Sequence, residues 1–144
     1  MKKALAVLFL LVLVLSIPLS SYAAGVSLVV PDECESTVKK VSTKTLSFRF
    51  EVKNTHPTKK IKSFEVTYYT CDEYDNQNGP TETATLTAEI RPYETIMAPE
   101  IFLKNAKITS VCAVRIALTK VRYSDGTYEY DNDPTYTRFW WTWK

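Results

Sequence analysis

The strongest constraint on the fold of this chain is a repeated alternation of apolar and polar residues. It occurs in "TLSFRFEVKN", residues 45–54, in "IKSFEVTYYTC", residues 61–71, and in "TETATLTAEI", residues 81–90. Because successive side chains of a strand point to opposite faces of a sheet, each segment is predicted to be a strand with one buried face. The side chains predicted to face the core are Leu46, Phe48, Phe50, Val52, Phe64, Val66, Tyr68, Ala84, Leu86, Ala88 and Ile90.

The later part of the chain continues this pattern with one interruption. In "ITSVCAVRIALTKVRY", residues 108–123, the apolar residues change parity near Thr119-Lys120, which predicts a β-bulge. The following Asp125-Gly126 predicts a two-residue hairpin that places Tyr123 opposite Tyr128. No segment has a helical period, and turn signals recur about every 8 to 12 residues. The prediction is an all-β protein, an antiparallel β-sandwich of seven or eight strands.

The N-terminal residues have the three parts of a secretory signal peptide. Lys2 and Lys3 precede an apolar run, residues 4–15, and Pro18 and a small-x-small site ending at Ala23 follow it. The run is shorter than the roughly 20 apolar residues that span a bilayer. We therefore expect cleavage after Ala23, so that residues 1–23 are the signal peptide and residues 24–144 are a single secreted or extracytoplasmic domain.

Charge and motifs exclude several classes of function. Lys2 and Lys3 account for the excess of 18 Lys and Arg over 16 Asp and Glu, so the mature domain is near neutral, and neither nucleic acid nor an anionic membrane surface is an expected partner. No G-x-S-x-G elbow, phosphate loop, HExxH or dinucleotide fingerprint occurs. The one histidine, His56, lies in a predicted loop without an acidic neighbour. We predict that the protein is not an enzyme and uses no cofactor.

Two acidic loops are the candidates for a metal site. "DEYDNQNG", residues 72–79, and "DNDP", residues 131–134, supply the oxygens that calcium prefers, but neither has EF-hand spacing. Turns are rich in Asp and Asn for backbone reasons alone. The sequence therefore predicts no metal site.

Three cysteines, Cys34, Cys71 and Cys112, in a chain bound for an oxidising compartment predict one disulfide and one thiol left over. Cys71 ends one predicted strand and Cys112 begins a neighbouring one, so Cys71–Cys112 is the first choice of bridge, although alternation places the two on opposite faces. Cys34 is either free or an alternative partner. Glu33 and Glu35 would disfavour its thiolate through like charge.

Three motifs occur in the order found in a known type of domain. They are "VKNTHPTKKIKSFEVTYYTCDEYDNQNG", residues 52–79, "IRPYET", residues 90–95, and "ALTKVRYSDGT", residues 117–127. Together they resemble the FxLYD-type, immunoglobulin-like domains of exported bacterial proteins, with Tyr93 where those domains have a glycine. The resemblance implies an immunoglobulin-like sandwich outside the cytoplasm. The families concerned are largely of unknown function, so it implies no catalytic residues.

Aromatic residues at the C-terminal end are the candidates for ligand contact. "TRFWWTWK", residues 137–144, holds all three tryptophans, and alternation assigns Phe139, Trp141 and Trp143 to the core but Trp140 to the other face. Tyrosine and tryptophan give large contacts at a low entropic cost. The candidate contacts are Tyr128, Tyr130, Tyr136 and Trp140. The alternative is that the tyrosines pair with one another within a sheet.

These observations predict a non-catalytic binding module at the cell envelope or outside the cell. Its ligand is expected to be a protein, a peptide or a glycan. The alternative is a structural or assembly module that pairs through an edge strand or an intermolecular disulfide.

Overall fold

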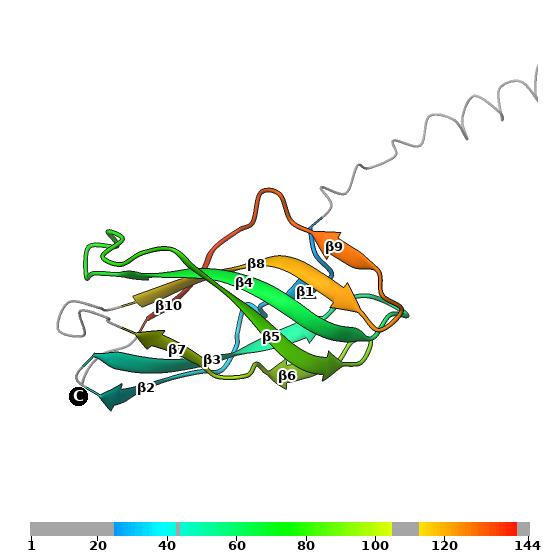
Figure 1. Ribbon diagram of the computed structural model, residues 1–144, viewed down its shortest axis with the longest axis horizontal. Coiled ribbons are helices and arrows are strands. Elements are labelled where there is room, and N and C mark those ends of the chain that lie inside the picture. The colour runs from blue at the N-terminus through cyan, green and yellow to red at the C-terminus, as the bar shows by residue number, and fades with distance from the viewer. Residues whose placement is uncertain (1–24, 43, 105–112, 141–144) are drawn as a thin grey trace, which may run out of the picture.

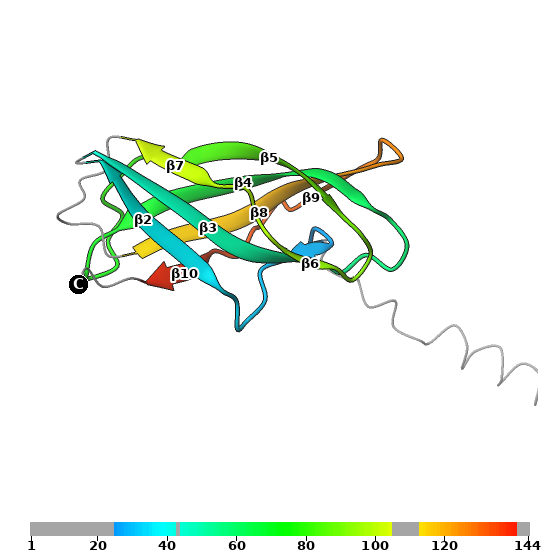
Figure 2. The same cartoon turned by 90° about the horizontal axis from the view of Figure 1, so that it is seen from below.

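The computed structural model describes residues 25–42, 44–104 and 113–140, and of Trp140 only the backbone. The predicted signal peptide, Cys112, Trp141 and Trp143 lie outside these ranges. The described residues form two antiparallel sheets packed face to face, the first as the lower layer in Figure 1 and in front in Figure 2. They contain no helix long and apolar enough to cross a membrane.

The first sheet is built around β3 (Thr45–Asn54). Along one edge of β3 lie β1 (Leu28–Val29) and then β2 (Ser36–Ser42). Along its other edge lie β6 (Thr95–Met97) and β7 (Ile101–Lys104). The sheet is therefore three strand positions wide.

The second sheet is built around β4 (Ile61–Cys71) and β8 (Ala113–Tyr123), which pair along their whole length. The outer neighbour of β4 is β5 (Glu82–Ile90). The other edge of β8 pairs with β9 (Tyr128–Tyr130) and β10 (Thr137–Trp140). In the described residues, ten strands thus occupy three and four positions in two sheets, which confirms the predicted antiparallel β-sandwich with more strands than the seven or eight predicted.

The core lies where alternation predicted it. The four apolar side chains of β3, from Leu46 to Val52, are at most 1% exposed, and Phe64 and Val66 of β4 are equally buried. Phe139 of β10 was also predicted to be buried, and its ring lies 5.2 Å from that of Phe48 and 5.8 Å from that of Phe50, between centroids. Each fully buried side chain of this size contributes about 1.5 to 3 kcal/mol to folding.

The bulge predicted near Thr119-Lys120 is confirmed. Glu65 of β4 faces Lys120, whereas the next residue, Val66, faces Leu118, so Thr119 is the extra residue of β8. Val121 and Tyr123 consequently point into the core. Lys120 and Arg122 are thereby placed on the outer face of the sheet.

The predicted register of the hairpin is wrong by one residue. Arg122 faces Tyr128 and Lys120 faces Tyr130, so the turn contains three residues, Ser124 to Gly126. A two-residue turn of type I′, which Asp-Gly favours, needs a positive φ at both central residues, whereas here Gly126 alone, at +86°, has one. The predicted pair of Tyr123 and Tyr128 is therefore absent, and the two rings lie on opposite faces of the sheet.

Candidate binding site

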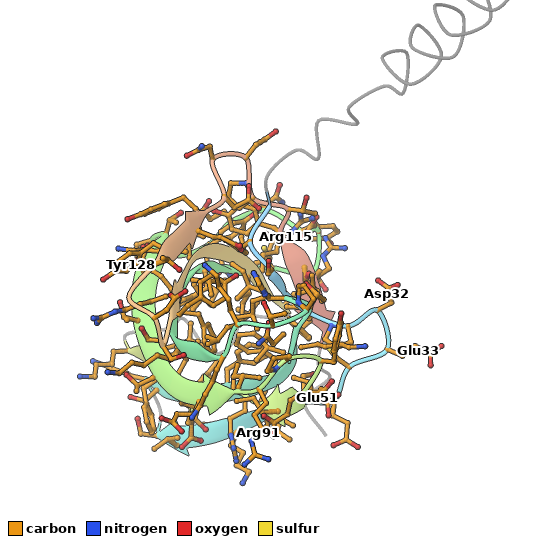
Figure 3. The ribbon with its side chains drawn as sticks, turned by 90° about the vertical axis from the view of Figure 1, so that its right-hand side faces the viewer. Asp32, Glu33, Glu51, Arg91, Arg115 and Tyr128 are labelled. Atoms are coloured by element: carbon orange, nitrogen blue, oxygen red, sulfur yellow. The ribbon has the colours of Figure 1, made fainter. Side chains whose placement is uncertain are left out.

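Two tyrosines of β9 form an exposed aromatic pair at the edge of the second sheet. Tyr128 and Tyr130 are 44% and 53% exposed, and their rings lie 6.2 Å apart at 26°. In Figure 3, Tyr128 projects outward on the side of β9. Both were predicted as ligand contacts, and the structure brings them together.

Two cations of β8 lie against these rings. Lys120 Nζ is 4.7 Å from the ring centroid of Tyr128 and 5.1 Å from that of Tyr130. Arg122 Cζ is 5.6 Å from the Tyr128 centroid. Each such contact contributes about 0.5 to 1 kcal/mol at an exposed site. In the part of the chain that the structure describes, neither cation forms an ion pair with a carboxylate.

The cations and Tyr128 border an open concavity on the outer face of the sheet. It has a volume of about 160 Å³ and crosses four strands. Its lining residues are Ser63, Phe64, Glu65, Thr85, Lys120, Arg122 and Tyr128. The pairing of β4 with β8 shifts register on both sides of this stretch, and such bulges increase local twist, which hollows the face.

Glu65 is the carboxylate that lines this concavity. Its Oε1 accepts a hydrogen bond from Thr119 Oγ1 at 3.2 Å, and the same hydroxyl lies 3.3 Å from the Glu65 carbonyl oxygen. The bulged Thr119 therefore holds Glu65, although Glu65 faces Lys120 in the register. The concavity has one hydrogen-bonded carboxylate and two cations that have no carboxylate partner among the described residues.

The other two predicted contacts lie elsewhere. Tyr136 packs on Tyr69, with ring centroids 5.2 Å apart, beside the first half of β8. The backbone of Trp140 pairs with Ala113, at the far end of β8 from the concavity, and its side chain is outside the described part. The structure does not join them to Tyr128 and Tyr130. Sequence analysis missed Lys120 and Arg122, although the parity change at Thr119 was the signal that places them outward.

A second pair of cations lies at the start of β8. Arg115 and Arg138 face each other across β8 and β10, and both bind the carboxylate of Asp75. Arg115 Nε donates to Asp75 Oδ1 at 3.1 Å. Asp75 has a φ of +68°, and the three side chains are 28% to 30% exposed. This cluster is a closed internal ion pair.

The cluster lies beside the buried thiol of Cys71. Burial raises the pKa of Cys71, and the charges of Arg115 and Arg138 oppose that rise. In the same loop, the Asp72 carboxylate accepts hydrogen bonds from the backbone N–H groups of Tyr74 and Asn76. These backbone contacts account for the acidic residue that opens "DEYDNQNG", and among the described residues no group of three His, Cys, Asp or Glu could hold a metal ion.

The cysteines that the structure describes, Cys34 and Cys71, form no disulfide with each other. Cys112 lies outside the described residues, so the Cys71–Cys112 bridge stays a prediction. The residue after it, Ala113, directly faces Cys71 in the register. Burial and then Glu51 raise the pKa of Cys34. The pKa of the Cys34 thiol is therefore raised, as predicted, but the negative charge that contributes is that of Glu51 on β3 instead of those of Glu33 and Glu35.

His56 has a structural role in the loop between β3 and β4. Its Nδ1 accepts hydrogen bonds from the backbone N–H groups of Thr58 at 3.1 Å and Lys59 at 2.9 Å. Its ring meets the edge of Tyr123, with centroids 5.1 Å apart. The lone pair that a general base would need is thus occupied by the turn.

No family model matches the sequence, and no curated protein matches it. A β-glucuronidase from Bacteroides uniformis aligns with a TM-score of 0.39 and 19% identity, over 76% of this chain and 13% of that one. A putative β-galactosidase from Bacteroides fragilis aligns with a TM-score of 0.37 and 17% identity, over 73% of this chain and 15% of that one.

A Northeast Structural Genomics Consortium target aligns with a TM-score of 0.41 and 11% identity, over 78% of this chain and 85% of that one. The chain thus spans less than a sixth of the two glycosidases. Similarity at this level carries no argument about function.

Proposed function

We propose that this protein is a non-catalytic binding module of the cell envelope or the extracellular space, whose ligand presents an anionic group to the concavity beside β9. The ligand is a protein, peptide or glycan that carries a carboxylate or sulfate. The observation that carries the proposal is the pair Lys120 and Arg122, held on exposed tyrosine rings without a carboxylate partner in the described part of the chain.

The position of Lys120 favours an anionic ligand over a neutral one. Its ammonium group lies against the rings of both Tyr128 and Tyr130, so a neutral sugar stacking on the same ring faces would have to displace it. An anion instead adds a charge-assisted hydrogen bond to a cation that is already positioned. The rings then supply contact area and hold the cations in place.

Two features support binding rather than catalysis. The single histidine is held in a turn by two backbone N–H groups. Glu65 has no second carboxylate among the residues that line the concavity, whereas acid–base chemistry on most ligands needs two positioned groups. The extracytoplasmic location is supported by the charged, apolar and small-residue parts of residues 1–23.

The proposal is tested with immobilised polymers that differ in charge. Polygalacturonate, sulfated dextran and polyglutamate supply carboxylate or sulfate on sugar and peptide, and plain dextran is the neutral control. We expect at least one acidic polymer to bind and dextran not to bind, and the affinity should fall as salt is added. Binding to dextran as strong as to every acidic polymer, or no binding to any acidic polymer, contradicts the proposal.

Paired tyrosine variants locate the site. Tyr128→Ala with Tyr130→Ala should lower the affinity at least about tenfold, or about 1.4 kcal/mol, because both rings that hold the cations are lost. Tyr74→Ala with Tyr93→Ala is the matched control, since those tyrosines are 78% and 62% exposed but lie in loops outside β9. An equal loss in both double variants would place the ligand elsewhere.

A further inference from the structure

The edges of the two sheets differ in how they are protected against pairing. Natural sheets block their edges with lysine, proline, bulges or short strands. Of the edge strands, β2 carries Lys39 and Lys40 and a register shift beside them. The strands β6 and β7 are separated by Pro99, and β9 and β10 by a loop with Pro134. The strand β1 has two residues.

The remaining edge strand, β5, has little of this protection. Its nine residues include no Pro, Gly, Lys or Arg, and within the described ranges no strand pairs with its outer edge. Its solvent face is a row of exposed threonines, Thr83, Thr85 and Thr87. The only irregularity in its pairing lies between Thr87 and Ile90, at its C-terminal end.

The core-facing side of β5 is also incompletely covered. The second sheet is four positions wide and the first is three, so one strand of the second lacks a full counterpart. Ala84 and Ala88 are accordingly only partly buried, on either side of Leu86. The outer edge of β5 therefore combines an incompletely covered row of apolar side chains with backbone N–H and C=O groups that no described strand pairs with.

We infer that β5 pairs antiparallel with β5 of a second copy of this chain, about a twofold axis at Leu86. This register places Ala84 beside Ala88 and Thr85 beside Thr87 of the copy, so the apolar row and the threonine row each continue across the junction. Charge repulsion does not oppose this pairing. The ionisable residues of β5 are Glu82 and Glu89, and in this register they face Ile90 and Thr83 of the copy instead of each other.

Pairing in this way has a consequence for ligand binding. A twofold axis perpendicular to the sheet keeps both outer faces on the same side. Thr85 lines the concavity beside β9, so two copies of that concavity would open on one continuous surface. A polymeric ligand could then engage both, which raises its apparent affinity without a new contact. The pairing itself does not depend on the proposed ligand.

The inference is tested by sedimentation equilibrium of the purified protein over a range of concentrations. Reductant is present to exclude disulfide-linked dimers. The mass should rise toward twice that of the monomer. Thr85→Lys with Thr87→Lys should remain monomeric, because the register sets lysine opposite lysine, and Thr85→Glu with Thr87→Glu should do the same. An equimolar mixture of the two double variants should dimerise again through opposite charges.

Thr37→Lys with Val41→Lys adds two lysines to the other exposed edge, β2, and should leave the mass of the wild type unchanged. Thermal melts by circular dichroism establish that each variant is folded. A wild type that is monomeric at every concentration overturns the inference. So does a loss of dimer in the β2 control, or a mixture of the two β5 variants that stays monomeric.

Discussion

A pair of cations lies at each end of β8 on the outer face of the sheet, and the surroundings of the two pairs differ. At the beginning, Arg115 and its neighbour Arg138 share the carboxylate of Asp75. At the end, Lys120 and Arg122 lie on tyrosine rings and have no ion-pair partner among the described residues. One end of β8 thus has cations that share an internal carboxylate, and the other end has cations that face solvent on tyrosine rings.

This difference separates a structural role from a binding role. Facing cations repel each other across a sheet, so Arg115 and Arg138 depend on the anion that the loop after β4 supplies. The ring faces of Tyr128 and Tyr130 satisfy their cations only in part, and a carboxylate or sulfate from outside adds to that stabilisation. Removal of the internal anion should therefore change stability, and removal of the open cations should change binding.

Replacement of the shared carboxylate should have the largest effect on stability. Asp75→Asn removes the negative charge that Arg115 and Arg138 share, while the two guanidinium groups still face each other. Truncating one partner of a fully buried pair costs about 3 to 5 kcal/mol, and solvent screening at side chains about 30% exposed reduces this to about 1 to 3 kcal/mol. Urea unfolding measures the change, which should be independent of ligand.

Asp32→Asn is the matched control, since Asp32 is an exposed carboxylate in a loop. Its effect should stay within about 0.5 kcal/mol. Equal stabilities of the two variants would show that the Asp75 cluster does not hold this end of β8.

The carboxylate of the hairpin gives a smaller effect that depends on pH. Hydrogen bonds from the Thr127 hydroxyl and N–H, together with Lys59, lower the pKa of Asp125 to about 2. The folded state thus favours the ionised form, so its contribution is complete above the ordinary pKa of 3.8 and is lost as the pH falls toward about 2.

Asp125→Asn should therefore be less stable than the wild type at neutral pH, and the difference should shrink between about pH 4 and pH 2. Thermal melts across that range measure it. A difference that stays constant down to pH 2 would mean that the charge of Asp125 does not stabilise the hairpin.

Alternation alone predicted most of the fold, because each strand buries one face. It identified the core residues of β3, β4 and β5, and the parity change at Thr119 located the bulge of β8. The register of the hairpin could not be predicted in the same way. It depends on whether Asp125 adopts a positive φ, and the backbone energy of that choice leaves no periodic signal.

The sequence predicted only part of the candidate site. Tyr128 and Tyr130 were chosen as candidates because tyrosines near the C-terminal end are numerous and are favoured at binding surfaces. Lys120 and Arg122 were missed because their position on the rings requires both the bulge and the register of β9. The contact of Asp75 with Arg115 joins residues 40 apart, which no local pattern reveals.

Non-reducing peptide mapping would test the predicted Cys71–Cys112 bridge.

Whether Lys120 and Arg122 are available to an external anion is tested most directly by one comparison of two double variants. The affinity for the acidic polymer that binds the wild type best is measured for Lys120→Gln with Arg122→Gln and for Lys39→Gln with Lys40→Gln on β2. Both double variants lose two positive charges. We predict at least a tenfold loss of affinity, about 1.4 kcal/mol, in the β8 variant and none in the β2 variant. Equal losses in both, or none in the β8 variant, would contradict the account.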